Sequence, residues 1–347
     1  MSKCAELANL IGNINAGGGG ANKNVIINGA MNVAQRNVSA TGLGADGNTY
    51  DVCDRWLLSV NGTDGRLTIT QDSSAPSGFS NSTKLACTTT DTSIAAGEFL
   101  TFTQKIEGQN LQSFAKGTSD AKPFAVSFYV KGNASATYVA ELMDNDNSNR
   151  HVSKSFTVTT DWTRVELSFP ADTTGTFDDD NACSMVLNIW LHAGETFNPA
   201  SGGTLQETWG TLSQASRAVG ISSFLDSVAR TFFITGVQLE VGQNPTSFEH
   251  EPFERTLAKC ERYYYKQNYV GSGGPYGHFS KNYSSSHRFV TIDHPTSMRA
   301  TPDSTFSANA SFTEYFSTAR HFKAYIAASS TNSTTYYLKA YQANAEL

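Results

Sequence analysis

Short runs in which apolar and polar residues alternate fill most of the chain between Val25 and Gly242. In Pro123–Lys131 and Arg164–Phe169, every second residue is a large apolar one. A period of two is typical of β-strands that bury one face. The pattern recurs in four further segments: Arg66–Thr70, Phe99–Ile106, Met185–His192 and Phe233–Val241. With turns rich in Gly, Asn, Asp and Ser between them, at least seven strands are expected, which predicts an all-β antiparallel sandwich over residues 25–245.

The N-terminal residues carry a different pattern. Leu7, Leu10, Ile11 and Ile14 follow the i, i+3, i+4, i+7 spacing of a helix, and Gly17–Gly20 come directly after them. This predicts a short amphipathic helix on a flexible tether over residues 1–24. Because a helix this short is unstable alone in water, its apolar stripe is expected to pack against a partner. A frayed terminus that happens to contain a few leucines is the alternative.

Residues after the sandwich predict a connector and a second domain. Thr246–Lys266, with Pro252 near its start, predicts a helix within a connector at residues 246–270. Residues 271–347 then predict a smaller β domain, with strands at Ser286–Asp293, Ala300–Phe306, His321–Ala328 and Thr335–Ala340.

One connection inside the sandwich is too long for a hairpin. Glu195–Arg230 contains Trp209 and a candidate helix at Leu212–Val228. Long connections with structure of their own often carry function, so Trp209 is a candidate binding residue.

The composition excludes several classes of partner. Only 16% of the 347 residues are charged, and the net charge is −6, which speaks against a nucleic-acid or anionic-membrane surface. No run resembles a membrane span or a signal peptide, so no membrane insertion is expected. The five scattered cysteines indicate reduced thiols rather than disulfides.

Motifs for catalysis are lacking, and the chain is not expected to be an enzyme. Gly42–Gly47 matches GxGxxG in letters, but no apolar strand precedes it and no helix follows. Glu141 and Glu166 can be nominated as a glycosidase pair, although the sequence cannot give their separation. No cofactor or metal is expected. Asp144 and Asp146 leave open an irregular calcium site, with a solvated hairpin turn as the alternative.

Alternation also suggests a binding face. If Leu187, Ile189 and Leu191 face the core, then Asn188, Trp190 and His192 share the opposite face, and Tyr129 also points away from the core. An aromatic ring among amides suits a sugar, whose C–H face packs on the ring while its hydroxyls need donors and acceptors. The alternative is that the long connection or a second subunit covers this face and buries Trp190.

Several segments resemble structural proteins of tailed bacteriophages, especially tail-fibre and minor virion proteins of phages that infect marine bacteria. The resembling segments span most of the chain: Asn28–Arg36, Tyr50–Trp56, Gln104–Asn110, Phe233–Gly242, Phe248–His250, Cys260–Tyr265, Met298–Pro302 and Ala345–Leu347. No catalytic residue is implied by the resemblance.

This resemblance implies a jelly roll similar to carbohydrate-binding modules, assembled as a homotrimer in the host cytoplasm and carried on the virion. The N-terminus would dock to other virion proteins, and the distal β domains would contact host surface polysaccharide. The alternatives are a capsid decoration protein without a receptor role and a carbohydrate-binding module or glycosidase outside any virion.

Overall fold

The computed structural model describes residues 23–268, 270–271, 274–275, 281–282, 287–308, 310–327 and 337–347. The chain divides into two compact units, Met1–Glu251 and Pro252–Leu347. The predicted N-terminal helix and its docking residues Leu7, Leu10, Ile11 and Ile14 lie outside the described residues. None of the helices in the described ranges is long and apolar enough to cross a membrane.

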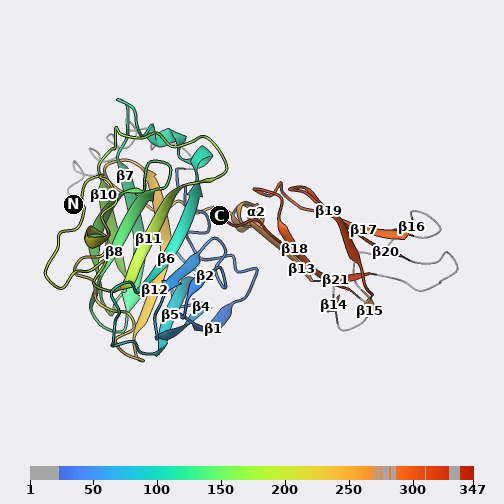
Figure 1. Cartoon of the computed structure of the whole chain (residues 1–347), viewed down its shortest axis with the longest axis horizontal. Coiled ribbons are helices and arrows are strands. Elements are labelled where there is room, and N and C mark those ends of the chain that lie inside the picture. Colours follow the sequence, from blue (N-terminus) through green and yellow to red (C-terminus); the bar gives the residue numbers. More distant parts are fainter. Residues whose placement is uncertain are drawn as a thin grey trace. The chain divides into compact units, whose positions relative to one another are not determined.

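The first unit is an antiparallel jelly-roll sandwich of two six-stranded sheets (Figure 1). One sheet has the order β1-β4-β5-β12-β7-β10, and its strands are Ser39–Leu43, Arg66–Asp72, Ser82–Thr89, Thr231–Val241, Phe124–Gly132 and Thr163–Phe169. The other has the order β2-β3-β6-β11-β8-β9, with strands Gly47–Thr49, Leu57–Asn61, Phe99–Glu107, Cys183–Ala193, Ala136–Asp144 and Arg150–Val158. All six segments predicted as strands from their alternation are strands.

The core forms where the inner faces of the two sheets meet. Val126 and Phe128 of β7 and Leu187 and Ile189 of β11 are fully buried in one apolar cluster. Val165 of β10 joins them, while its neighbour Glu166 is exposed. The inward and outward positions along these strands are therefore the ones that the alternation predicts.

Two of the segments that carry the phage resemblance, Asn28–Arg36 and Tyr50–Trp56, are joined by side-chain hydrogen bonds. Asn28 adopts a left-handed φ of 58°; its Nδ2 donates to the carbonyls of Val33 and Asp54, and its Oδ1 accepts from the backbone N–H of Val33. Asp54 Oδ1 in turn accepts from the backbone N–H of Gln35, at 2.9 Å. Trp56 Nε1 donates to the Asn28 carbonyl. These side-chain bonds satisfy the backbone of a segment that belongs to no sheet.

The second unit is a smaller β domain. In its described part, β13, β21 and β18 form one sheet and β16, β17, β20 and β19 another, with a short β14-β15 pair. The strands are Tyr264–Asn268, Leu338–Asn344, Asp303–Ala308, Lys281–Asn282, His287–Asp293, His321–Ala327, Thr313–Ser317, Val270–Gly271 and Gly274–Pro275. Phe322, Leu338 and Tyr341 are fully buried between the two larger sheets.

Two helix predictions need correction. The helix α2 covers only Phe253–Glu261, which is shorter than Thr246–Lys266, because Pro252 precedes its first turn and the chain turns into β13 at Tyr264. The candidate helix at Leu212–Val228 is wrong, since its only regular element is the single 3-10 turn η3 at Gln214–Ser216. None of the four described cysteines, Cys53, Cys87, Cys183 and Cys260, forms a disulfide.

Candidate functional site

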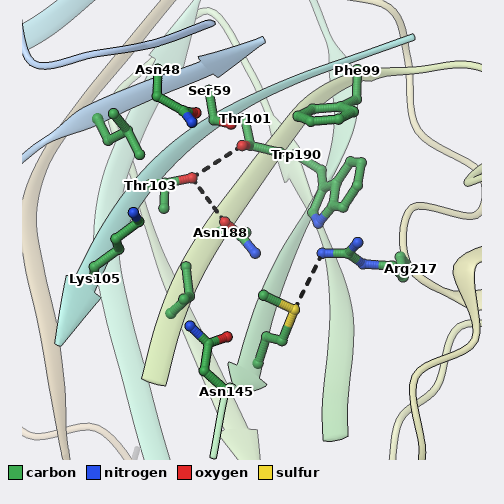
Figure 2. Close-up of a pocket in the computed structure, with 13 residues that line it drawn as sticks. Asn48, Ser59, Phe99, Thr101, Thr103, Lys105, Asn145, Asn188, Trp190 and Arg217 are labelled. Carbon is green, nitrogen blue, oxygen red and sulfur yellow. Dashed lines mark hydrogen bonds between the residues drawn. The ribbon is translucent and has the colours of Figure 1, made fainter. Parts of the chain in front are cut away.

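A groove of about 240 Å³ lies on the outer face of the sheet β2-β3-β6-β11-β8-β9 (Figure 2). Every second residue of the neighbouring strands faces the groove, and the residues between them face the core. The long connection between β11 and β12 adds Arg217 at one side. The lining consists of Asn48, Leu57, Ser59, Phe99, Thr101, Thr103, Lys105, Met143, Asn145, Val186, Asn188, Trp190 and Arg217, none of which is acidic.

The floor of the groove is a chain of hydrogen bonds between side chains. Figure 2 shows Thr103 between Thr101 and Asn188, with its hydroxyl 3.0 Å from Thr101 Oγ1 and 2.8 Å from Asn188 Oδ1. The Asn188 amide then donates to Glu141 Oε2 at 2.9 Å. These polar groups are therefore fixed before any ligand arrives, which lowers the entropic cost of binding.

Beside the floor, on the same outer face of the sheet, Glu141 of β8 is fully buried and accepts several hydrogen bonds. It accepts from Trp190 Nε1 at 2.9 Å and from Arg217 Nε and Nη2 at 2.7 and 2.8 Å, and His151 Nδ1 lies 3.1 Å away. Burial by itself raises the pKa of Glu141, but the charge and hydrogen bonds of Arg217, with help from His151, outweigh it and lower the pKa to about 2. Glu141 is therefore ionised at neutral pH and holds Arg217 against the sheet.

This geometry does not bring together the carboxylate pair nominated from the sequence. Glu166 is exposed on β10 of the other sheet, where it pairs with Arg164, whereas Glu141 is buried on β8 beside the groove. A carboxyl group with a pKa of about 2 also has no proton to donate near neutral pH, as a glycosidase acid must.

Trp190 lines the groove but is not an open platform for a sugar ring. Only 1% of it is exposed, because the long connection covers it: the Arg217 guanidinium lies 4.7 Å from its ring centroid and the Phe197 ring 5.2 Å. The expectation of an exposed Trp190 is therefore wrong, and the covered alternative is correct. Phe99, half-buried and 5.9 Å from Trp190, is the aromatic ring nearer to solvent.

Tyr129 and Trp209 lie elsewhere. Tyr129 is on β7 of the opposite sheet, where its ring packs against Phe79 at 5.3 Å, so it shares no face with Asn188. Trp209 lies 5.4 Å from the Phe124 ring and donates its indole N–H to the Pro170 carbonyl. Of the five residues proposed from the sequence, the structure brings only Asn188 and Trp190 into the groove.

His192 points to the rim of the sandwich rather than into the groove. Its buried imidazole contacts Ser223 Oγ at 2.8 Å through Nδ1, and Nε2 lies 3.7 Å from Glu98 Oε2. Burial lowers the pKa of His192, and burial together with the neighbouring carboxylate of Asp91 raises the pKa of Glu98. The side chains of Asp91, Glu98 and His192 form a buried cluster that is separate from the groove.

The candidate calcium site at Asp144 holds an ammonium group instead. Lys116 Nζ, fully buried, contacts a carboxylate oxygen of Asp144, lies 3.2 Å from Asp172 Oδ2, and donates to the carbonyls of Thr174 and Gly175 at 2.9 and 2.8 Å. This oxygen cage is the kind that a hard cation prefers, and the lysine fills it. Asp146 turns away and accepts from the Asp178 backbone N–H.

Several residues of the groove were not predicted. The period-two pattern of Phe99–Ile106 does place Phe99, Thr101 and Thr103 on one face, so they could have been found from their alternation. Asn48 and Arg217 could not have been found in this way. A strand of three residues and an irregular connection are too short or too irregular for a periodicity that shows which way a side chain points.

The second unit presents a group of aromatic rings in which Tyr315 is exposed and Phe289 and Tyr325 are half-buried. Tyr315, 60% exposed, lies 5.4 Å from Phe289, which in turn lies 5.8 Å from Tyr325, and Lys323 Nζ sits 4.3 Å above the Phe289 ring. Aromatic rings that are grouped at the surface of a protein commonly mark a contact surface. This surface is a second place at which a ligand could bind.

The sequence matches no known family profile and no curated protein. Among solved structures, the enzymatically active domain of tailspike protein 4 of bacteriophage CBA120 is similar over 63% of the chain, with 17% identity and a TM-score of 0.33. The chain spans about a fifth of that structure (21%). The N-terminal cellulose-binding domain of Cellulomonas fimi β-1,4-glucanase C is similar over 63% of the chain and 100% of its own length (16% identity, TM-score 0.30). The family 11 carbohydrate-binding module of Clostridium thermocellum is similar over 62% and 99% (13% identity, TM-score 0.30). What the groove does has to be inferred from its own side chains.

Proposed function

We propose that the chain is a non-catalytic carbohydrate-binding protein whose groove holds a segment of a polysaccharide. The observation that carries the proposal is the groove's chemistry: a half-buried ring, Phe99, stands beside amides and hydroxyls fixed on one sheet face. A sugar needs both an apolar surface for its C–H groups and paired donors and acceptors for its hydroxyls.

The size of the groove favours a chain segment over an enclosed small ligand. Ligand pockets usually measure about 300–1,000 Å³, and this one is smaller, at about 240 Å³, and has the exposed amides Asn48 and Asn145 at its edge. A few sugar units fit there while the rest of the polymer continues into solvent. Lys105 and Arg217, with no carboxylate in the lining, are also compatible with uronic-acid sugars.

We expect the edge amides to control affinity. Replacing Asn48 and Asn145 together with alanine should weaken binding of the best oligosaccharide about 10- to 30-fold, because each hydrogen bond contributes about 1 kcal/mol. A panel of neutral and uronate-containing oligosaccharides is screened first, and isothermal titration calorimetry then measures the dissociation constant of the best one. Asn110→Ala, an exposed asparagine outside the lining, is the matched control and should bind as wild type does.

The result distinguishes a wrong binding site from a wrong proposed function. Equal affinities of wild type and the double variant contradict the groove assignment. If Tyr315→Ala abolishes binding instead, the protein binds carbohydrate through its second unit. If no oligosaccharide on the panel binds, the proposed function itself is contradicted, and a decoration role without receptor contact gains support.

We further propose that the protein is a homotrimeric fibre or adhesin of a phage virion, attached through its N-terminal residues. The sequence segments that resemble phage structural proteins and the apolar stripe of residues 7–14 support this. Three copies of a shallow site also give avidity that a single groove lacks. Deleting residues 1–20 should leave folded trimers that fail to join particles. Normal incorporation of the truncated protein, measured by counting its copies in purified virions, would refute the docking assignment.

A further inference from the structure

A buried cluster of potential metal ligands lies at the rim of the sandwich, apart from the groove. Asp91 follows β5, Glu98 directly precedes β6, and His192 is near the end of β11. One ligand atom of each residue lies within 4.8 Å of the others, although His192 is far in the sequence from the loop that holds Asp91 and Glu98. The sequence therefore has no ligand spacing by which to recognise them.

Two of these side chains point unpartnered atoms into the cluster. His192 is fully buried and Glu98 is 6% exposed, yet neither His192 Nε2 nor Glu98 Oε2 has a hydrogen-bond partner among the described residues. A buried polar atom without a partner is costly, and native structures rarely keep one without a reason.

The remaining atoms of the ligands are held in place. Ser223 contacts His192 Nδ1 at 2.8 Å, and a proton on Nδ1 leaves the Nε2 lone pair directed toward the carboxylates. Asp91 accepts the backbone N–H groups of Asp64 and Ser93 at 2.9 and 3.2 Å, which orients it while each oxygen keeps a lone pair. This is how outer hydrogen bonds fix the ligands of a metal.

We propose that Asp91, Glu98 and His192 bind a divalent transition-metal ion, with Zn²⁺ as the ion that best suits them. One imidazole nitrogen and two carboxylates form a donor set that zinc accepts with water as a fourth ligand. A neutral histidine and two carboxylates also balance a charge of +2. Calcium and magnesium prefer sites made entirely of oxygen, so the histidine selects against them.

Bound metal would join two segments at this rim, the loop between β5 and β6 and the strand β11. The Asp91 N–H donates to the Leu225 carbonyl, and the Phe224 N–H donates to the Leu191 carbonyl, so the end of the long connection already lies against both the β5–β6 loop and β11. The metal would therefore fix the two segments to which the returning end of the connection is hydrogen-bonded, and this connection also supplies Arg217 to the groove.

Zinc should raise the melting temperature of the metal-stripped, tag-free chain. At a free zinc concentration 100-fold above the dissociation constant, the expected rise is roughly 5–10 °C, and calcium or magnesium should have no effect. Asp91→Asn and Glu98→Gln, which keep the shape of the site, should each lose most of the zinc shift while remaining folded.

Cobalt gives a second readout that does not depend on stability. Co²⁺ bound by the wild type should give visible d–d absorption at one ion per chain, and Glu98→Gln should abolish it. Glu207→Gln, an exposed glutamate outside the cluster, is the control and should retain both signals. The proposal is overturned if zinc leaves the wild-type melting temperature unchanged, or if the Asp91 and Glu98 variants respond to zinc and Co²⁺ as the wild type does.

Discussion

Replacing Lys116 with methionine is expected to lower the free energy of unfolding by about 3–5 kcal/mol. Methionine has nearly the same length, so the loss arises from charge rather than from a cavity. Without the ammonium, Asp144 stays buried with no cationic partner among the described residues, and the carbonyls of Thr174 and Gly175 lose their donor. Contacts of Lys116 Nζ with the Phe177 and Trp209 rings, at 5.1 and 5.4 Å, are lost as well.

Urea unfolding of the purified chain measures this loss. Lys122→Met is the control, because no ion pair of Lys122 occurs within the described residues, and it should change stability by less than about 0.5 kcal/mol. A loss below 1 kcal/mol for Lys116→Met would show that the cage around the ammonium does not stabilise the sandwich.

Glu141→Gln is expected to cost a similar amount, about 3–5 kcal/mol at neutral pH. The substitution keeps the shape of the side chain but removes the charge that pairs with Arg217, and it turns an amide N–H₂ toward the Asn188 and Trp190 donors. Glu166→Gln is the matched control, since that glutamate is exposed, and its loss should stay below about 1 kcal/mol.

The difference in stability between wild type and Glu141→Gln depends on pH because of the pKa of Glu141. The pKa is about 4.3 in an unfolded chain and falls to about 2 in the folded protein, so the stabilisation is complete above roughly pH 4.3. It is lost as the pH falls through 2. The gap in stability between wild type and Glu141→Gln should therefore shrink by about 1–2 kcal/mol between pH 6 and pH 3. A gap independent of pH would contradict the depressed pKa.

Alternation of apolar residues predicts the sandwich well because it reports burial directly. The strand positions and the core residues Val126, Leu187 and Val165 follow from a period of two, which needs no knowledge of the partner strand. The same pattern does not say to which sheet a strand belongs. Tyr129 and Trp190 both point away from the core, yet they lie on opposite sides of the sandwich.

The groove and the two buried clusters depend on contacts that have no local signal in the sequence. Trp190 is buried because an irregular connection folds over it and places Arg217 on its ring, and nothing in the letters of that connection fixes its path. Likewise, the spacing of Asp144 and Asp146 suggested an ion, whereas Lys116, distant in sequence, supplies the cation. His192 meets Asp91 and Glu98 only because β11 lies beside β6 in the folded sheet.

The most direct test of the carbohydrate-binding groove is a crystal structure of the chain with the oligosaccharide that binds best in solution. We predict that the sugar lies on the sheet between Phe99, Asn48 and Asn145, with its hydroxyls bonded to the edge amides and with Trp190 still covered by Arg217. A sugar bound instead at Tyr129 or on the aromatic rings around Tyr315, with the groove empty, would contradict this account.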